Sequence, residues 1–135
     1  MADAKALIAL IGRFGLAGLA CTLTGFAVIA VLDAGFHVAP TLANLLGYLV
    51  GVPLSFALNR SFVFRHEGAA SITVGKFLVS VAGAFCLNQV MLRLAGGFLG
   101  SGTVPHLAAQ LAGMATYTLT TFLAARYWVF RSADA

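Results

Sequence analysis

The sequence predicts an all-α membrane protein with four transmembrane helices, arranged as two repeated hairpins of the same orientation. Three observations support this prediction: an apolar composition, four apolar runs of spanning length, and a motif that occurs twice. Hydrophobic residues make up 61% of the 135 residues and charged residues 9%, whereas soluble domains are about half apolar and about a quarter charged. A soluble fold of this length has too little interior to bury so much apolar surface, so we expect the chain in a bilayer.

The four apolar runs have the length of membrane-spanning helices. They cover residues 14–32, 40–58, 77–94 and 105–125. Each is close to the roughly 20 residues that an α-helix needs to cross about 30 Å of hydrocarbon. We therefore expect one transmembrane helix in each run.

Residues 3–13 precede the first run and combine basic and apolar side chains. Lys5 and Arg13 fall on one side of a helix, largely opposite Leu7, Leu10 and Ile11. This pattern predicts a short helix that lies in the membrane interface. A signal peptide is the alternative, but Arg13 interrupts the apolar stretch and no small-residue cleavage site follows.

The basic residues predict the orientation of the spans. All but one of the eight basic residues precede the first span, lie between the second and third, or follow the fourth: Lys5, Arg13, Arg60, Arg65, Lys76, Arg126 and Arg131. Only Arg93 falls on the other side. The positive-inside rule therefore predicts a multi-pass protein of the cytoplasmic (inner) membrane with both termini and the middle loop in the cytoplasm.

An internal repeat organises the chain as a single domain over residues 1–135. Residues 43–65 align with residues 109–131 without a gap and share an ordered set of Ala, Leu, Gly, Phe, Arg and Val. Upstream, the pair Arg13-Phe14 aligns with Lys76-Phe77. We predict repeat 1 over residues 13–65 and repeat 2 over residues 76–131. Because both hairpins begin and end in the cytoplasm, a pseudo-two-fold axis along the membrane normal is expected to relate them.

Polar side chains form a stripe on the second span. At about 100° per residue, Asn44, Tyr48, Ser55 and Asn59 fall on one helical face. The aligned face of the fourth span carries Tyr117 and Thr121, and the third span adds Asn88. These residues indicate either a substrate-facing groove or polar contacts that hold the helices together, and both are compatible with the pattern.

Several motifs resemble one family of membrane proteins. "RFGLAG" opens the first span, "GYLVG" lies in the second, and "SFALNRSFVF" and "TFLAARYWVF" close the second and fourth. Together they resemble the GtrA-like family over residues 13–131. The resemblance implies a four-span protein that flips a polyprenyl-phosphate-linked monosaccharide across the cytoplasmic membrane, supplying sugars for cell-surface polysaccharides.

The motif at the end of each half fits such a lipid. Arg60 and Arg126 can give forked hydrogen bonds to phosphate oxygens, and aromatic rings at head-group level can contact prenyl units or a sugar. The alternative is an ordinary aromatic belt with basic anchors. The candidate substrate-binding residues are Asn44, Tyr48, Ser55, Asn59, Arg60, Phe64, Asn88, Tyr117, Thr121, Arg126 and Trp128.

The sequence does not support an enzyme. It contains no acid pair, nucleophile–base set, metal-ligand cluster or glycine-rich phosphate loop, so we expect no cofactor, no metal and no nucleic acid. The expected partners are the lipid-linked sugar and membrane phospholipids. An adaptor that docks a glycosyltransferase is the alternative function, and a proton-coupled drug exporter is a third, although the spans lack a deep carboxylate. Four short helices make a thin wall for a bulky lipid head group, so we also expect a homodimer.

Overall fold

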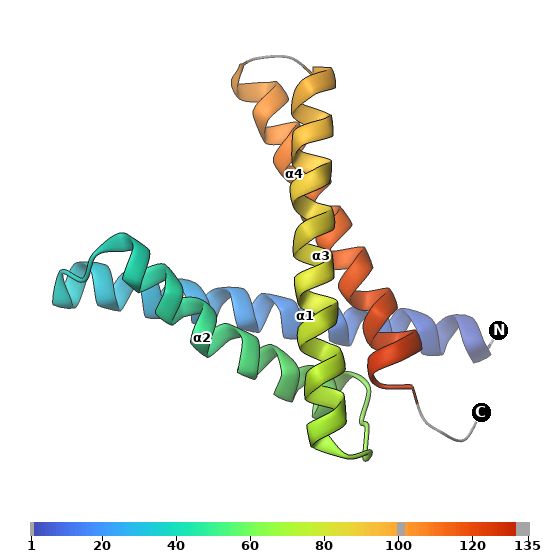
Figure 1. Cartoon of the computed structure of the whole chain (residues 1–135). Coiled ribbons are helices and arrows are strands. Elements are labelled where there is room, and N and C mark those ends of the chain that lie inside the picture. The colour runs from blue at the N-terminus through green and yellow to red at the C-terminus, as the bar shows by residue number, and fades with distance from the viewer. Residues whose placement is uncertain (1, 100–101, 132–135) are drawn as a thin grey trace. The chain divides into compact units, whose positions relative to one another are not determined.

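The computed structural model describes residues 2–99 and 102–131, and within them every regular element is helical (Figure 1). The elements are α1 (Ala2–Ala30), the π-helical turn η1 (Val31–Gly35), α2 (Pro40–Leu58), the π-helical turn η2 (Asn59–Val63), α3 (Ala70–Leu99), α4 (Thr103–Ala124) and the π-helical turn η3 (Ala125–Val129). The predicted all-α class is therefore confirmed for the described residues.

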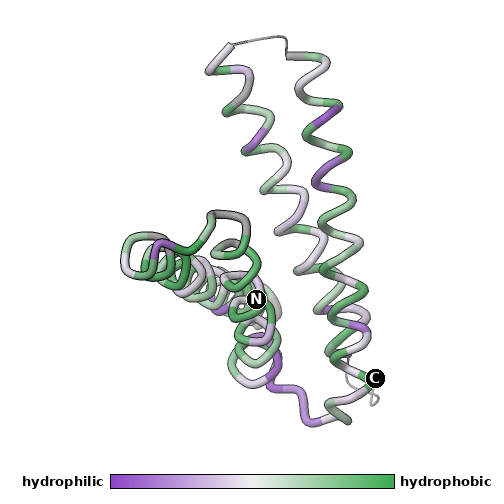
Figure 2. The backbone as a smooth tube through the Cα atoms, turned by 60° about the vertical axis from the view of Figure 1, so that its left-hand side comes forward, coloured by the Kyte–Doolittle hydropathy of each residue, from purple (hydrophilic) through white to green (hydrophobic). Residues whose placement is uncertain are grey.

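The chain divides into two compact units. Unit 1 covers Met1–Glu67, where α1 packs against α2, and unit 2 covers Gly68–Ala135, where α3 packs against α4. Figure 2 shows hydrophobic residues along most of the four helices. Each unit is thus a helical hairpin with apolar surfaces.

Three helices are long and apolar enough to cross a membrane. They cover Ala4–Ala30, Leu45–Val63 and Ala70–Phe98, so the first three predicted spans coincide with helices of suitable length and composition. The fourth predicted span falls in α4, whose 22 residues match the length of a span. However, α4 carries Gln110 and several threonines, which lower its hydropathy. A four-span arrangement therefore stays a prediction.

The segment that precedes the first predicted span belongs to α1. This helix continues from Ala2 to Ala30 without a break at Arg13, because its first turns consist mainly of Ala, Leu and Ile, which tolerate helical conformation well. The predicted short helix is present as the beginning of a longer one. Its location in the membrane interface stays a prediction.

Close helix contacts at two glycines hold the hairpins together. A Cβ atom placed on Gly47 of α2 would lie 2.9 Å from Ile29 Cγ1 of α1, and one placed on Gly113 of α4 would lie 2.9 Å from Leu92 Cγ of α3. Both glycines are buried and occupy aligned positions in the sequence. Small residues allow such close approach between membrane helices.

The second helix of each unit ends in a π-turn at the aligned position. Phe64 N donates to Asn59 O at 2.9 Å, and Phe130 N donates to Ala125 O at the same distance. The last residue of each turn is a buried valine: Val63 is 2% exposed and Val129 is 3% exposed. Each helix therefore extends one turn beyond its α-helical part, and the motif arginine lies within that extra turn.

Candidate functional site

Asn59 is the centre of a buried polar group in unit 1. Its side chain, on the first residue of η2, is 5% exposed. Nδ2 donates to Ser55 O at 2.8 Å and approaches Ser55 Oγ at 3.3 Å. The Ser55 side chain also lies close to the Cys21 thiol of α1. The three residues thus connect the two helices of the hairpin at the end that carries η2.

The carbonyl oxygen of the Asn59 side chain has no hydrogen-bond partner within the described residues. An unpaired buried acceptor costs roughly 1–3 kcal/mol. Rotating the amide by 180° gives no relief, because it would turn Oδ1 toward the Ser55 carbonyl, which is itself an acceptor. Within the described residues, unit 1 therefore holds one buried hydrogen-bond acceptor that is unpaired.

Arg60 forms two hydrogen bonds with His66, which together we name the Arg60 clasp. Arg60 Nε donates to His66 O at 3.3 Å, and His66 N donates to Arg60 O at 2.8 Å. Between them, Arg65 adopts the left-handed conformation with φ of 50°, which reverses the chain after η2. Arg60, which the sequence predicts to bind phosphate, therefore also stabilises the turn that ends unit 1.

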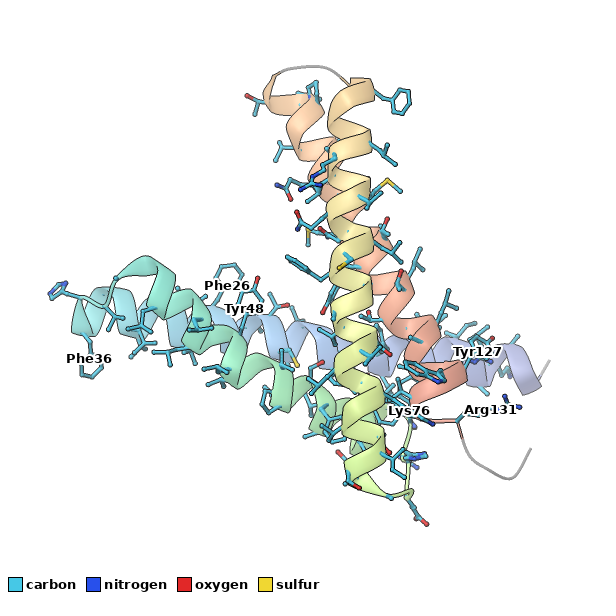
Figure 3. All side chains as sticks on the ribbon, in the orientation of Figure 1. Phe26, Phe36, Tyr48, Lys76, Tyr127 and Arg131 are labelled. Atoms are coloured by element: carbon cyan, nitrogen blue, oxygen red, sulfur yellow. The ribbon has the colours of Figure 1, made fainter. Side chains whose placement is uncertain are left out.

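In unit 2, alanine occupies the position of Asn59. Ala125 is buried, and the next residue, Arg126, places its guanidinium carbon 5.2 Å from the centroid of the Tyr127 ring. Phe130 contacts Phe77 of α3 with ring centroids 6.4 Å apart, which anchors the end of η3. Figure 3 shows Tyr127, Lys76 and Arg131 at the same end of unit 2.

The other predicted residues of unit 2 form mainly local contacts. Thr121 Oγ1 donates to Tyr117 O at 2.8 Å, so the hydroxyl is bonded to its own helix. Asn88 Oδ1 accepts a hydrogen bond of 3.5 Å from Gln89. Asn88 also lies beside Gly113, where an added Cβ would be 3.2 Å from its Nδ2. The Trp128 side chain is exposed.

In unit 1, the structure brings only part of the predicted stripe together. Ser55 and Asn59 are hydrogen-bonded, whereas Tyr48 is 69% exposed (Figure 3) and no hydrogen bond within the described residues joins it to this pair. Phe64 is half-buried after η2. The Asn44 side chain lies outside the described residues.

Sequence reasoning did not assign Cys21 to the site, and it considered Tyr127 only as one of several aromatic surfaces for prenyl units or a sugar. No residue near Cys21 in the sequence indicates its contact with Ser55, because the contact joins two different helices. Tyr127 did carry a usable indication: it directly follows the motif arginine, where the aligned residue in repeat 1 is Ser61.

Comparison with known proteins identifies the family. The family model described as "GtrA/DPMS, transmembrane domain" matches residues 13–130, which is most of the chain. Neither the curated proteins nor the solved structures gave a significant match. The extent of the family match agrees with three helices that are suited to cross a membrane. This chain is therefore a membrane protein that belongs to the GtrA/DPMS transmembrane domain family.

Proposed function

We propose that the protein flips a polyprenyl-phosphate-linked monosaccharide across the cytoplasmic membrane, supplying sugars for cell-surface polysaccharides. One observation carries the proposal: an arginine occupies the same position of a π-turn at the end of the second helix in both units. Membership of the GtrA/DPMS family supports it by association with lipid-linked sugars. The proposed activity moves a lipid and breaks no covalent bond.

The chemistry of the π-turns suits the head group of such a lipid. The Arg60 and Arg126 guanidiniums offer charge-assisted hydrogen bonds to phosphate oxygens. The unpaired Asn59 Oδ1 accepts a hydrogen bond, and each sugar hydroxyl is a donor that costs a few kcal/mol when it enters hydrocarbon unpaired. The aromatic side chains of Phe64 and Trp128 supply apolar surface for prenyl units.

We also propose the membrane arrangement of the chain: four spans, two hairpins of the same orientation, and both termini in the cytoplasm. The matching contacts of Gly47 and Gly113 support two equivalent hairpins. The basic residues near η2 and η3 support a cytoplasmic location for these turns. A reporter fused after Arg131 is expected to be active only in the cytoplasm, and activity only in the periplasm would refute this orientation.

The decisive experiment measures transbilayer movement of a labelled polyprenyl-phosphate sugar in liposomes that contain the purified chain. We expect faster movement than in protein-free liposomes. Arg126→Gln is expected to slow it strongly, because the variant loses a charge-assisted fork. Arg65→Gln is the matched control, since it removes one positive charge from the turn after η2 without touching either motif arginine.

The same experiment separates the adaptor function. Movement at the protein-free rate, together with a glycosyltransferase that co-purifies with the full chain, would support an adaptor and refute the flippase. A homodimer is expected in either case. It is measured by the mass of the protein in detergent after the bound detergent is subtracted.

A further inference from the structure

The two motif arginines have different neighbours although the residues before them have nearly the same backbone conformation. Arg60 and Arg126 are each the second residue of a π-turn. The residues before them have nearly the same conformation, with φ and ψ of −63° and −43° at Asn59 and of −59° and −47° at Ala125. The residue that follows each arginine differs, being Ser61 in unit 1 and Tyr127 in unit 2.

In unit 1, the following residue takes no part in holding the arginine. Ser61 Oγ donates to Ala57 O at 2.6 Å, so the hydroxyl is bonded to its own helix. The guanidinium is held instead by the Arg60 clasp, in which Nε donates to His66 O. One edge of the Arg60 guanidinium is thus committed to the turn.

In unit 2, an aromatic ring lies beside the motif arginine. Tyr127 is 59% exposed, and the Arg126 guanidinium lies 5.2 Å from its ring centroid, within the roughly 6 Å over which cation–π attraction acts. Within residues 2–99 and 102–131, no hydrogen bond or ion pair involves the Arg126 side chain. A cation–π contact uses no N–H group as a hydrogen-bond donor, so it leaves the Arg126 donors available to a ligand.

We propose that Tyr127 is a positioning residue that presents the Arg126 guanidinium to a lipid phosphate. This inference rests on the proposed function and adds a residue to it. Phosphate oxygens bind a guanidinium in its plane, whereas an aromatic ring binds its face, so both contacts exist together. Holding the long side chain over the ring before the lipid arrives reduces the conformational entropy lost on binding.

Intrinsic fluorescence provides the measurement. Trp128 is the single tryptophan of the chain and directly follows Tyr127, so its emission reports on ligands that reach η3. The full chain in phosphatidylcholine nanodiscs is titrated with a short-chain polyprenyl phosphate, and in a parallel arm with phosphatidylglycerol. The second arm distinguishes the proposed substrate from an ordinary membrane phosphate.

We expect Tyr127→Ala to weaken the apparent affinity for polyprenyl phosphate about two- to five-fold, the size of an exposed cation–π contact. Tyr127→Phe keeps the ring and is expected to restore the wild-type value. In an Arg126→Ala background, Tyr127→Ala is expected to have no further effect, because its role passes through the arginine. Phe98→Ala, which removes an exposed aromatic ring from α3, is the matched control and is expected to change nothing.

Each outcome decides one of the two proposals. Wild-type affinity in Tyr127→Ala, or an equal loss in the Arg126→Ala background, refutes the positioning role and leaves the proposed function intact. Wild-type protein that binds polyprenyl phosphate no better than phosphatidylglycerol refutes the proposed substrate. An equal loss for both lipids in Tyr127→Ala then still supports a positioning role toward membrane phosphates in general.

Discussion

Replacing Asn59 with alanine is expected to slow movement of the lipid-linked sugar while leaving the stability of the protein nearly unchanged. Most buried asparagines have their hydrogen-bonding groups paired, so their loss destabilises the fold. Asn59 differs because its Oδ1 is buried without a partner in the described residues. Because this atom lacks a partner there, we expect the substitution to lower transport without lowering the stability of the protein.

The structure gives the size of the effect on stability. The variant loses the hydrogen bond of 2.8 Å from Asn59 Nδ2 to Ser55 O, which contributes about 0.5–1.5 kcal/mol. Ser55 O keeps its bond from the Asn59 backbone N–H, so no new unpaired carbonyl appears. Removing Oδ1 recovers roughly 1–3 kcal/mol, and the small cavity left behind offsets part of this gain. The net change is expected to lie within about 1 kcal/mol of zero.

The assay combines thermal unfolding of the purified chain with movement of the lipid-linked sugar in liposomes. We expect Tm to stay within about 4 °C of wild type, and transport to fall about two- to ten-fold, which corresponds to one hydrogen bond to a sugar hydroxyl. Ser61→Ala is the matched control, because the Ser61 hydroxyl bonds only its own helix. A large fall in Tm would show that Asn59 is a structural residue, and unchanged transport would remove it from the substrate path.

Three further variants test the scaffold around the site. Gly47→Ala is expected to destabilise unit 1 by about 1–3 kcal/mol, because the new Cβ would lie 2.9 Å from Ile29 Cγ1; Ile29→Ala should restore stability in the double variant, and Gly51→Ala, which meets open space, should have no such cost. Arg60→Met removes the donor of the Arg60 clasp and is expected to increase hydrogen exchange of the amides in that turn, whereas unchanged exchange would show that the clasp is not formed in solution. Arg65→Gly is expected to stabilise the turn by up to about 1 kcal/mol in thermal unfolding, because φ of 50° is strained for arginine, and a loss of stability would contradict this reading of the turn.

The elements that depend on local residue types were predictable from the sequence. The second span was predicted over residues 40–58 and is observed as α2, Pro40–Leu58, since Pro40 suits the first turn of a helix. The third was predicted over residues 77–94 and extends over Ala70–Leu99, because polar residues such as Ser71 continue a helix although they interrupt an apolar run. Hydropathy thus located the helices better than their ends.

The contacts that build the site were not predictable, because they depend on packing between helices. Nothing in "NRSFVF" distinguishes a π-turn from an α-turn, and π-turns are too rare to assume. The turn becomes clear only from the hydrogen bond of Phe64 N to Asn59 O, which joins residues five positions apart. The contact between Cys21 and Ser55 likewise joins residues that are far apart in the sequence. The repeat did indicate that Arg60 and Arg126 have equivalent positions, and both lie at the same place in their π-turns.

The two units resemble each other in scaffold and differ in chemistry, and this difference constrains the mechanism. Gly47 and Gly113 make the same kind of close contact, whereas Asn59 corresponds to Ala125. A buried unpaired acceptor is costly, and Ala125 shows that the π-turn forms without one. The Asn59 amide is therefore not needed to build the turn. We expect that it accepts a hydrogen bond from a hydroxyl of the transported sugar.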